Sequence, residues 1–237
     1  GNDTVTTGAA NDVINVGTGS DNVVAGAGDD LITVVVDGTD TVTGDAGTDR
    51  LSIDASAFNY GGYGSRIWWE GKDAAGNAVT GVAFNSSWQS ILDYVAKVTT
   101  NQLNIYSDYW GYPRVAILTF SGVENLDVSG SAAVASNDLI FARGTGNYNG
   151  GLGDNDALVA DLSAMTSAVT FVTGSGQTYN YLGSTFANFE GFLIQTGNAD
   201  DYIDAHVAGV SNHLVLAEGD NTALTASGND FISAGSG

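Results

Sequence analysis

Aspartate returns with a nine-residue period through the first 54 residues of this chain. Asp3, Asp12, Asp21 and Asp30 are nine residues apart, and after one extra residue the series continues with Asp40 and Asp49. Each aspartate is followed two positions later by an apolar residue, in order Val5, Ile14, Val23, Ile32, Val42 and Leu51. A fixed period of this length is typical of a solenoid in which each repeat packs only on its neighbours.

Each nine-residue unit divides into a glycine-containing turn and a short strand. Glycine permits the positive φ that a tight turn needs, and the aspartate closes the turn. The apolar residue that follows points inward, because side chains of a strand alternate between its two faces. Two units complete one coil, so equivalent positions recur every 18 residues or so. The pattern predicts a parallel β-roll with a thin apolar core.

Stacked coils would place Asp3 over Asp21 and Asp12 over Asp30. Facing carboxylates repel one another unless a cation lies between them. Ca²⁺ binds six to eight oxygen atoms from carboxylates and backbone carbonyls, which glycine-rich turns expose. A flexible linker and a metal-free solenoid are the alternatives, although a linker has no reason to keep an apolar residue after every aspartate. The predicted calcium ligands of this first block are Asp3, Asp12, Asp21, Asp30, Asp40 and Asp49, with Gly17, Gly19, Gly26 and Gly28.

The period returns in two later blocks. Asp138, Asn147 and Asp156 are again nine residues apart, and a glycine-rich turn precedes Asp156. The third block is more degenerate. The candidate calcium ligands of these two blocks are Asp138, Gly151, Gly153, Asp154, Asp156, Asp201 and Asp230. The chain also begins and stops inside apparent units, so we expect the roll to continue beyond it.

Two excursions separate the roll blocks. The order is a roll over 1–56, an excursion over 57–118, a roll over 119–161, an excursion over 162–187 and a degenerate roll over 188–237. Two similar segments, from Phe120 to Gly130 and from Phe186 to Gly197, end the excursions with the pattern Phe-x₃-Glu-x-apolar. They are interpreted as strands that rejoin the roll. Glu124 and Glu190 within them either bind cations or cap the turn.

The first excursion predicts a small, aromatic-rich α+β lobe on the side of the roll. It contains all four tryptophans, including Trp110 in a turn-like segment. The pattern predicts a hairpin over 67–84, a helix from about Trp88 to Val98 capped by Ser86 or Ser87, and a second hairpin over 103–120. The second excursion predicts one hairpin, from 169–172 to 178–181. The expected fold class is therefore all-β, a calcium-binding parallel β-roll or β-solenoid interrupted by two excursions.

Composition excludes several functions. The net charge is −21, from 27 acidic and 6 basic residues, and no basic stripe favours nucleic acid. There is no cysteine for a disulfide or thiolate framework, and no apolar run of transmembrane length. The common catalytic and nucleotide-binding motifs are absent, and His206 and His213 make a poor basis for a zinc site. We therefore expect a protein that is not an enzyme.

The units at 17–24, 26–33, 44–52 and 150–158 resemble the repeats-in-toxin, or haemolysin-type, calcium-binding nonapeptide, Gly-Gly-x-Gly-x-Asp-x-apolar-x. The resemblance implies bound Ca²⁺ and secretion as an unfolded chain that folds outside the cell. The roll–excursion design looks more like surface-layer or adhesin material than an enzyme's secretion tail. The expected function is an extracellular, calcium-stabilised structural or adhesive module of a bacterial surface protein. Its expected partners, besides calcium, are further copies of itself or a cell-surface polysaccharide. The alternatives are a carbohydrate-binding module built on the aromatic excursion, and a calcium-binding accessory region of a secreted enzyme.

Overall fold

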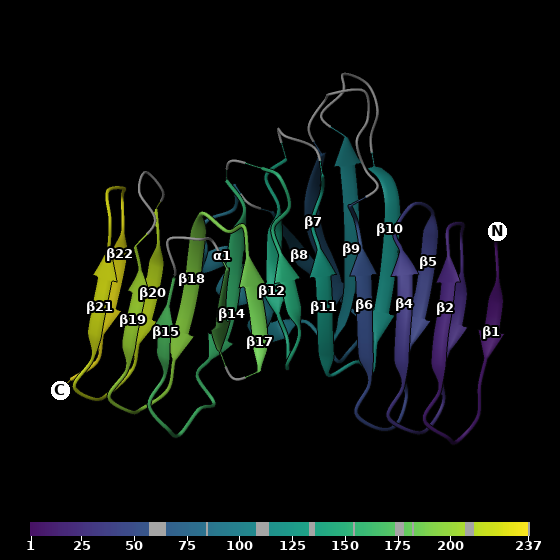
Figure 1. Ribbon diagram of the computed structural model, residues 1–237, viewed down its shortest axis with the longest axis horizontal. Helices are drawn as coiled ribbons and strands as arrows, with labels where there is room; N and C mark the ends of the chain where they lie inside the picture. Colours follow the sequence, from purple (N-terminus) through teal and green to yellow (C-terminus); the bar gives the residue numbers. More distant parts are fainter. Residues whose placement is uncertain are drawn as a thin grey trace.

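The computed structural model describes residues 1–56, 65–83, 85–107, 114–132, 136–153, 155–173, 178–181, 183–206 and 211–236. The molecule is elongated, and the two chain ends lie at opposite ends of its long axis (Figure 1). Strands run across this axis and stack along it, mostly in parallel pairs. This arrangement is the predicted parallel β-roll.

Two sheets form the two faces of the first block. Sheet A has the order β1 (Thr4–Thr6), β3 (Asn22–Val24), β5 (Thr39–Thr43), β10 (Arg114–Ser121), β9 (Thr100–Ser107), β7 (Ser65–Lys72) and β8 (Ala78–Ala83). Sheet B has the order β2 (Val13–Gly17), β4 (Leu31–Val35), β6 (Arg50–Asp54), β11 (Asn125–Ser129), β13 (Asn147–Asn149), β17 (Ser184–Ala187) and β16 (Thr178–Tyr181).

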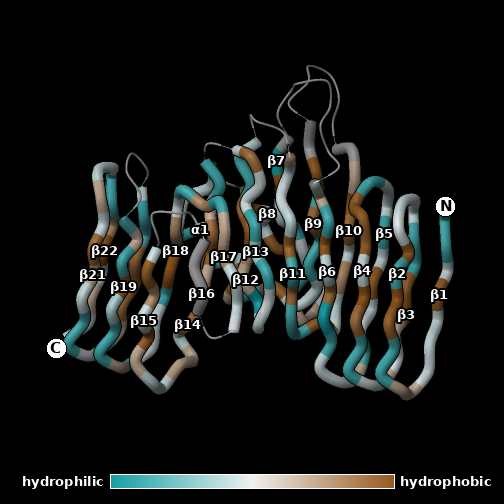
Figure 2. The backbone as a smooth tube through the Cα atoms, in the orientation of Figure 1, coloured by the Kyte–Doolittle hydropathy of each residue, from teal (hydrophilic) through white to brown (hydrophobic). Residues whose placement is uncertain are grey.

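The predicted apolar residues lie in register between these two sheets. Val5, Val23 and Val42 are aligned across sheet A, and Ile14, Ile32 and Leu51 across sheet B. Five of these six side chains are buried, and Val5, in the first strand, is half-buried. Apolar positions alternate with polar ones along the stacked strands (Figure 2). The inward alternation expected from the nine-residue period is confirmed.

Two further sheets continue the roll toward the C-terminus. Sheet C has the order β12 (Leu139–Ala142), β14 (Ala157–Leu162), β18 (Gly191–Thr196), β20 (His213–Leu216) and β22 (Phe231–Ala234). Sheet D has the order β15 (Thr170–Val172), β19 (Tyr202–Ala205) and β21 (Thr222–Thr225). Four consecutive residues are buried at the start of both β14 and β18. Burial of both faces is typical of a parallel strand that is covered on each side, and here the first excursion supplies the outer cover.

The strands of the first excursion extend sheet A, which differs from the expected lobe on the side of the roll. β7 and β8 form the hairpin over 67–84, and β9 and β10 form the second hairpin. However, β10 also pairs in parallel with β5, and Phe120 aligns with Val42. The physical reason is that β5 would otherwise leave an unpaired edge. Phe120 also continues the inward apolar row of that sheet.

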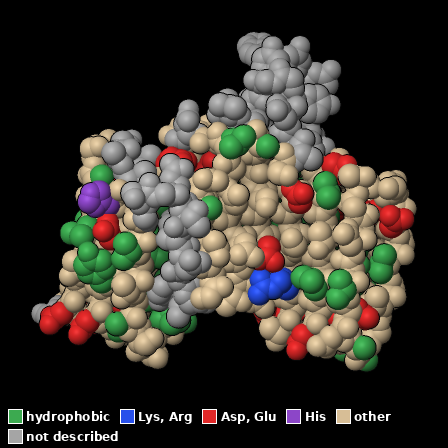
Figure 3. Space-filling model, in the orientation of Figure 1, with side chains coloured by type: hydrophobic (Ala, Val, Ile, Leu, Met, Phe, Trp, Pro, Cys, Tyr) green, Lys and Arg blue, Asp and Glu red, His purple; other side chains and the backbone are tan. Residues whose placement is uncertain are grey.

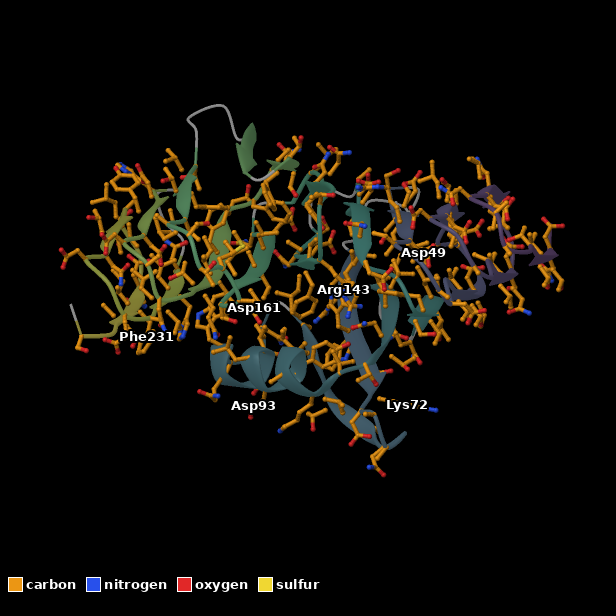
Figure 4. The ribbon with its side chains drawn as sticks, turned by 90° about the horizontal axis from the view of Figure 1, so that it is seen from below. Asp49, Lys72, Asp93, Arg143, Asp161 and Phe231 are labelled. Atoms are coloured by element: carbon orange, nitrogen blue, oxygen red, sulfur yellow. The ribbon has the colours of Figure 1, made fainter. Side chains whose placement is uncertain are left out.

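The helix of the same excursion is α1 (Trp88–Lys97). The Ser87 side chain caps its N-terminus by accepting a hydrogen bond from the Ser90 backbone N–H. Ile91 and Tyr94 are its buried residues, and Asp93 points away from the rest of the molecule (Figure 4). The one-sided burial follows from the spacing of apolar residues along the helix.

The lobe also shares a core with the second roll block. The Trp69 ring is 1% exposed, and it packs edge-on against Phe120 and Phe141 at 6.2 and 5.0 Å between centroids. Its Nε1 donates a hydrogen bond of 2.6 Å to the Leu139 carbonyl in β12. The Tyr94 ring stacks on Phe141 at 5.5 Å. The lobe is therefore packed into the roll at this junction.

The second excursion pairs differently from the predicted hairpin. β15 pairs in parallel with β19 in sheet D, whereas β16 pairs antiparallel with β17 in sheet B. Val169 and Phe171 are buried, and the Phe171 ring packs edge-on against Phe186 and Phe192. These inward side chains make β15 a regular coil of the roll, so the antiparallel hairpin begins only at β16.

Candidate calcium sites

The aspartates of the first block form two hydrogen-bonded ladders. In the first, Asp21 Oδ1 accepts the Asp3 backbone N–H at 2.7 Å, and Asp40 Oδ1 accepts the Asp21 N–H at 2.9 Å. In the second, Asp30 Oδ1 accepts the Asp12 N–H at 2.8 Å, and Asp49 Oδ1 accepts the Asp30 N–H at 2.9 Å. The stacking expected from the sequence is confirmed, with one carboxylate oxygen of each later aspartate bonded to the preceding coil.

The second carboxylate oxygen of these aspartates is buried without a partner. Asp21, Asp30, Asp40 and Asp49 are 0–2% exposed, and within the described ranges Oδ2 of each has no hydrogen-bond partner. Burying a charged oxygen without a hydrogen bond or a counter-ion costs at least about 1–3 kcal/mol. A bound cation would supply that compensation. The donor set fits Ca²⁺, which prefers carboxylate and carbonyl oxygens.

The raised pKa values of the ladder carboxylates also indicate that a counter-ion would stabilise these sites. Burial raises the pKa of Asp40 to about 6, and the neighbouring Asp21 and Asp37 carboxylates add to the rise. Burial also raises the pKa of Asp49, helped by Asp30 and Glu124. A divalent cation beside the same carboxylates would favour their ionised form.

The turns around the ladders expose backbone carbonyls. Gly17, Gly19, Gly26 and Gly28 have φ values of 71°, 135°, 93° and 133°, which favour glycine. A Cβ added to Gly28 would lie 2.6 Å from the Ala10 carbonyl oxygen of the preceding coil. Over the described part of the chain, no three acidic or histidine side chains gather at one point. A cation in these turns would therefore take one or two carboxylates and complete its shell with carbonyls and water.

A third ladder runs through the second block. Asp156 Oδ1 accepts the Asp138 N–H at 2.7 Å, and Asp156 Oδ2 is buried without a hydrogen-bond partner among the described residues. Burial, with Asp138 and Glu190 nearby, raises the pKa of Asp156 to about 8. A Cβ on Gly153 would lie 2.8 Å from both Asp156 carboxylate oxygens, and Gly151 has a φ of 110°. These residues reproduce the arrangement of the first block. The predicted ligand Asp154 lies outside the described residues.

Asp138 differs from the other predicted ligands, because both of its oxygens accept backbone hydrogen bonds. Oδ1 accepts the Ile67 N–H at 2.9 Å, and Oδ2 accepts the Ser131 N–H at 2.8 Å. Its carboxylate therefore connects β7 of the lobe to the second block. Burial raises the pKa of Asp138 to about 7, against the lowering effect of these two bonds. We interpret Asp138 as a structural link between lobe and roll.

The third block keeps the ladder only in part. Asp201 Oδ1 accepts the Val169 N–H at 2.8 Å, and its Oδ2 is buried without a partner. Asp230 Oδ1 instead accepts both the backbone N–H and the side-chain amide of Asn212, at 2.9 and 3.0 Å. Asn221 takes the next ladder position after Asp201. With amides replacing carboxylates, these turns offer a cation less negative charge than the first block does.

Two glutamates occupy ladder positions that an aspartate-based pattern misses. Glu124 Oε2 accepts the Asp49 N–H at 2.9 Å, and Glu190 Oε2 accepts the Asp156 N–H at 2.8 Å. The signal in the sequence is the apolar residue two positions later, Leu126 or Phe192, which follows glutamate as it follows the aspartates. Both glutamates therefore belong to the carboxylate ladders.

The two histidines lie in separate surroundings. His206 Nδ1 lies 3.3 Å from Asp204 Oδ1 near the end of β19. The His213 ring in β20 stacks on Phe231 at 4.2 Å and lies 5.8 Å from Trp88, and burial lowers its pKa. The rings around His213 place it in an aromatic cluster between α1 and sheet C.

The acidic character of the chain is visible on its surface. On the face shown in Figure 3, acidic side chains are spread from one end of the molecule to the other, and basic ones gather at one place. Arg50 in β6 of sheet B is paired with Asp127 at 3.2 Å. Among the described residues, no helix is long and apolar enough to span a membrane.

Comparison with known proteins gives a match in the repeat blocks. The family model for the RTX calcium-binding nonapeptide repeat (four copies) matches residues 1–32, 36–52 and 211–237. The match includes the degenerate third block and does not include the 150–158 turn. Neither the comparison with curated proteins nor that with solved structures gave a match. The stacked aspartate turns of the first block agree with this match, and the matched segments, 1–32, 36–52 and 211–237, are RTX calcium-binding nonapeptide repeats.

Proposed function

We propose that this chain is an extracellular, calcium-stabilised structural or adhesive module of a bacterial surface protein. The observation that carries the proposal is the row of buried aspartates whose Oδ2 atoms have no partner in the part of the chain that the structure describes. A net charge of −21 adds repulsion between neighbouring coils. Calcium would relieve both penalties, so the roll would be stable only where calcium is plentiful, as it is outside cells.

Calcium would be held mainly by the two ladders of the first block and by Asp156. When bound, the ion would neutralise the stacked carboxylates and join the turns of successive coils. The protein contributes the buried Oδ2 atoms, the carbonyls of the glycine turns, and the hydrogen bonds that fix Oδ1 of each aspartate. Because binding to the folded state alone stabilises it, each site adds about 2.7 kcal/mol at a hundredfold excess of calcium over its Kd.

Circular dichroism of the full chain with calcium, and with excess chelator, tests the calcium-dependent part of this proposal. We expect chelation to remove β structure from the first block and to lower the melting temperature. A reversible return of the spectrum on adding Ca²⁺, but not on adding the same ionic strength of NaCl, would support a specific site. An identical spectrum and melting temperature with and without calcium would contradict the proposal.

We further propose a non-catalytic role in assembly or adhesion. A layer or matrix protein needs a rigid, repetitive body, and the continuous stack of sheets supplies one (Figure 1). Calcium-dependent formation of sheets or filaments by the purified chain, followed by electron microscopy, tests this role. A chain that remains monomeric at all calcium concentrations would count against self-assembly, and polysaccharide binding would then be the remaining form of adhesion.

The carbohydrate-binding alternative depends on accessible aromatic rings. Trp69 is buried, and Trp88 packs partly against the core beside His213. Trp110, the best candidate from the sequence, lies outside the described residues. Binding on a glycan array that is lost in Trp110→Ala would favour this alternative over a purely structural role.

A further inference from the structure

The two turns that return the chain from the excursions to the roll have the same structure. Gly44 N–H donates to the Ser121 carbonyl at 3.0 Å, and Gly150 N–H donates to the Ala187 carbonyl at 3.0 Å. The next residues, Gly122 and Asn188, both have left-handed φ values, of 61° and 57°. The similar segments ending in Glu124 and Glu190 are therefore one structural device used twice, and we call them the re-entry turns, 122–124 and 188–190.

Each re-entry turn faces a long, glycine-containing turn of the preceding coil. The long turns run from Gly44 to Asp49 and from Gly150 to Asp156 between successive strands. The re-entry turns have only three residues, and their middle residues, Val123 and Phe189, are buried in the core. The extra methylene of glutamate lets its carboxylate reach the backbone N–H that an aspartate reaches elsewhere.

The first pair of turns brings an unpartnered buried oxygen to the same place. Asp49 is fully buried, and its Oδ2 has no hydrogen-bond partner. A Cβ added to Gly44 would lie 2.6 Å from this Oδ2 and would also collide with the Gly122 carbonyl oxygen. A carboxylate oxygen of the long turn and a carbonyl oxygen of the re-entry turn therefore lie against the same glycine. Glu124 is bonded to the Asp49 N–H beside them.

The second pair repeats this arrangement. Asp156 is fully buried, its Oδ2 has no partner, and Glu190 is bonded to its N–H. A Cβ on Gly150 would collide with the Asn188 carbonyl oxygen and would lie 2.7 Å from Asp156 Cβ. A carbonyl of the re-entry turn and the buried aspartate of the long turn thus lie against both glycines, although the two re-entry turns are 66 residues apart, and in the second copy the carboxylate oxygens of Asp156 face Gly153.

We propose that each re-entry turn completes a divalent-cation site, in which the glutamate carboxylate and the carbonyl of residue 122 or 188 join the buried aspartate of the long turn. This inference rests on the proposed calcium-dependent role and adds two sites that lack the second glycine turn of the repeat. Each site has two carboxylates, from Asp49 and Glu124 in the first and from Asp156 and Glu190 in the second. Carboxylate and carbonyl oxygens are the ligands that Ca²⁺ prefers. The glutamates therefore allow a calcium roll to be interrupted by an excursion without losing the ion at the break.

The test is a count of bound ions in the full chain by isothermal titration of the calcium-stripped protein with CaCl₂. Glu124→Gln and Glu190→Gln keep an oxygen acceptor for the Asp49 or Asp156 N–H and remove only the negative charge. We expect each variant to bind one ion fewer than the native chain, and the double variant two fewer. Glu70→Gln is the matched control, because Glu70 lies on β7 and its carboxylate interacts with Gln102 and Asn104.

Circular dichroism in calcium shows which variants fold, and the two sites can be tested separately if one substitution prevents folding. One outcome is that the native chain takes up calcium while Glu124→Gln and Glu190→Gln bind as many ions as Glu70→Gln, with unchanged affinity. That result would overturn the glutamate sites and leave the proposed function standing. A native chain that takes up no calcium would overturn both.

Discussion

Replacing Asp40 by asparagine should change stability in opposite directions with and without calcium. Asp40 Oδ1 accepts the Asp21 N–H, and its Oδ2 is buried without a partner. Asparagine keeps an oxygen for the Asp21 N–H and removes the charge. Without calcium, the substitution removes a buried charge and should therefore stabilise the fold. With calcium it loses part of a binding site.

The calcium-free effect follows from the pKa of Asp40, which burial raises to about 6 from about 3.9 in an unfolded chain. Because the pKa is higher in the folded state, protonated Asp40 stabilises the fold. This stabilisation is full below about pH 4 and is lost as the pH rises through about 6. At pH 8 the ionised side chain therefore costs the fold up to about 3 kcal/mol, or about 1–2 after screening by water near the turn. Asp40→Asn should recover this amount in chelator.

The calcium-bound effect has the opposite sign. A tenfold loss of affinity at one site costs about 1.4 kcal/mol when calcium is in excess. For a chain of this size, each kcal/mol shifts the melting temperature by roughly 2–4 °C. We therefore expect Asp40→Asn to melt several degrees higher than the native chain in chelator and several degrees lower in excess calcium, at pH 8.

Asp93→Asn is the matched control, because Asp93 lies on the exposed side of α1 (Figure 4). It should change the melting temperature little, and equally, in both conditions. If the calcium-free chain is too unstable to melt, refolding in trimethylamine oxide gives the same comparison. An Asp40→Asn variant that is less stable than the native chain in chelator, or equally stable in calcium, would refute the assignment of Asp40 as a buried calcium ligand.

Three further predictions concern the calcium-free fold, the lobe and the turns. In chelator, lowering the pH from 8 toward 4 should raise the melting temperature. The reason is that burial raises the pKa of Asp156 to about 8 and of Asp138 to about 7, so their protonation over this range removes buried charge. A melting temperature that falls over this range would contradict the prediction. Trp69→Ala should destabilise the whole chain by about 3–5 kcal/mol in one cooperative transition, and Trp88→Ala by less; a separate early transition of the lobe would show that it folds independently. Gly47→Ala should lower both stability and calcium affinity, because Gly47 has a φ of 146° and an added Cβ would collide with the Gly28 carbonyl; unchanged calcium titration would contradict the close stacking of these turns.

The junction at Trp69 also changes what a deletion of the lobe should do. A lobe on the side of the roll, as the sequence predicts, could be removed with little harm to the roll. In the structure, deletion would leave β5 without its neighbour β10 and would expose Phe141 and Leu139 in β12. It would also remove the Ile67 N–H that Asp138 accepts. We therefore expect the roll to need the lobe.

The sequence by itself determines the repeating part of this protein. In a nine-residue unit every requirement is local: glycine for the turn, aspartate at its end and an apolar residue two positions later. Because identical units stack on one another, local pattern and tertiary contact coincide, and the alignments of Ile14 with Ile32 and of Asp12 with Asp30 follow directly. The expectation of calcium also comes from the sequence, because stacked carboxylates repel one another and the first block matches a calcium-binding repeat.

Only the tertiary structure decided how the excursions join the roll. Strand periodicity shows which face of a strand is apolar but not which strand lies beside it, so β10 could pair with β9 alone or also with β5. The same ambiguity led to a predicted pairing of β15 with β16, which in fact belong to different sheets. Likewise, Asp138 looks like every other aspartate of the period until Ile67, 71 residues earlier in the chain, is brought against its carboxylate. Contacts between distant segments depend on which apolar surfaces remain to be covered after the roll has formed, and no local pattern encodes that choice.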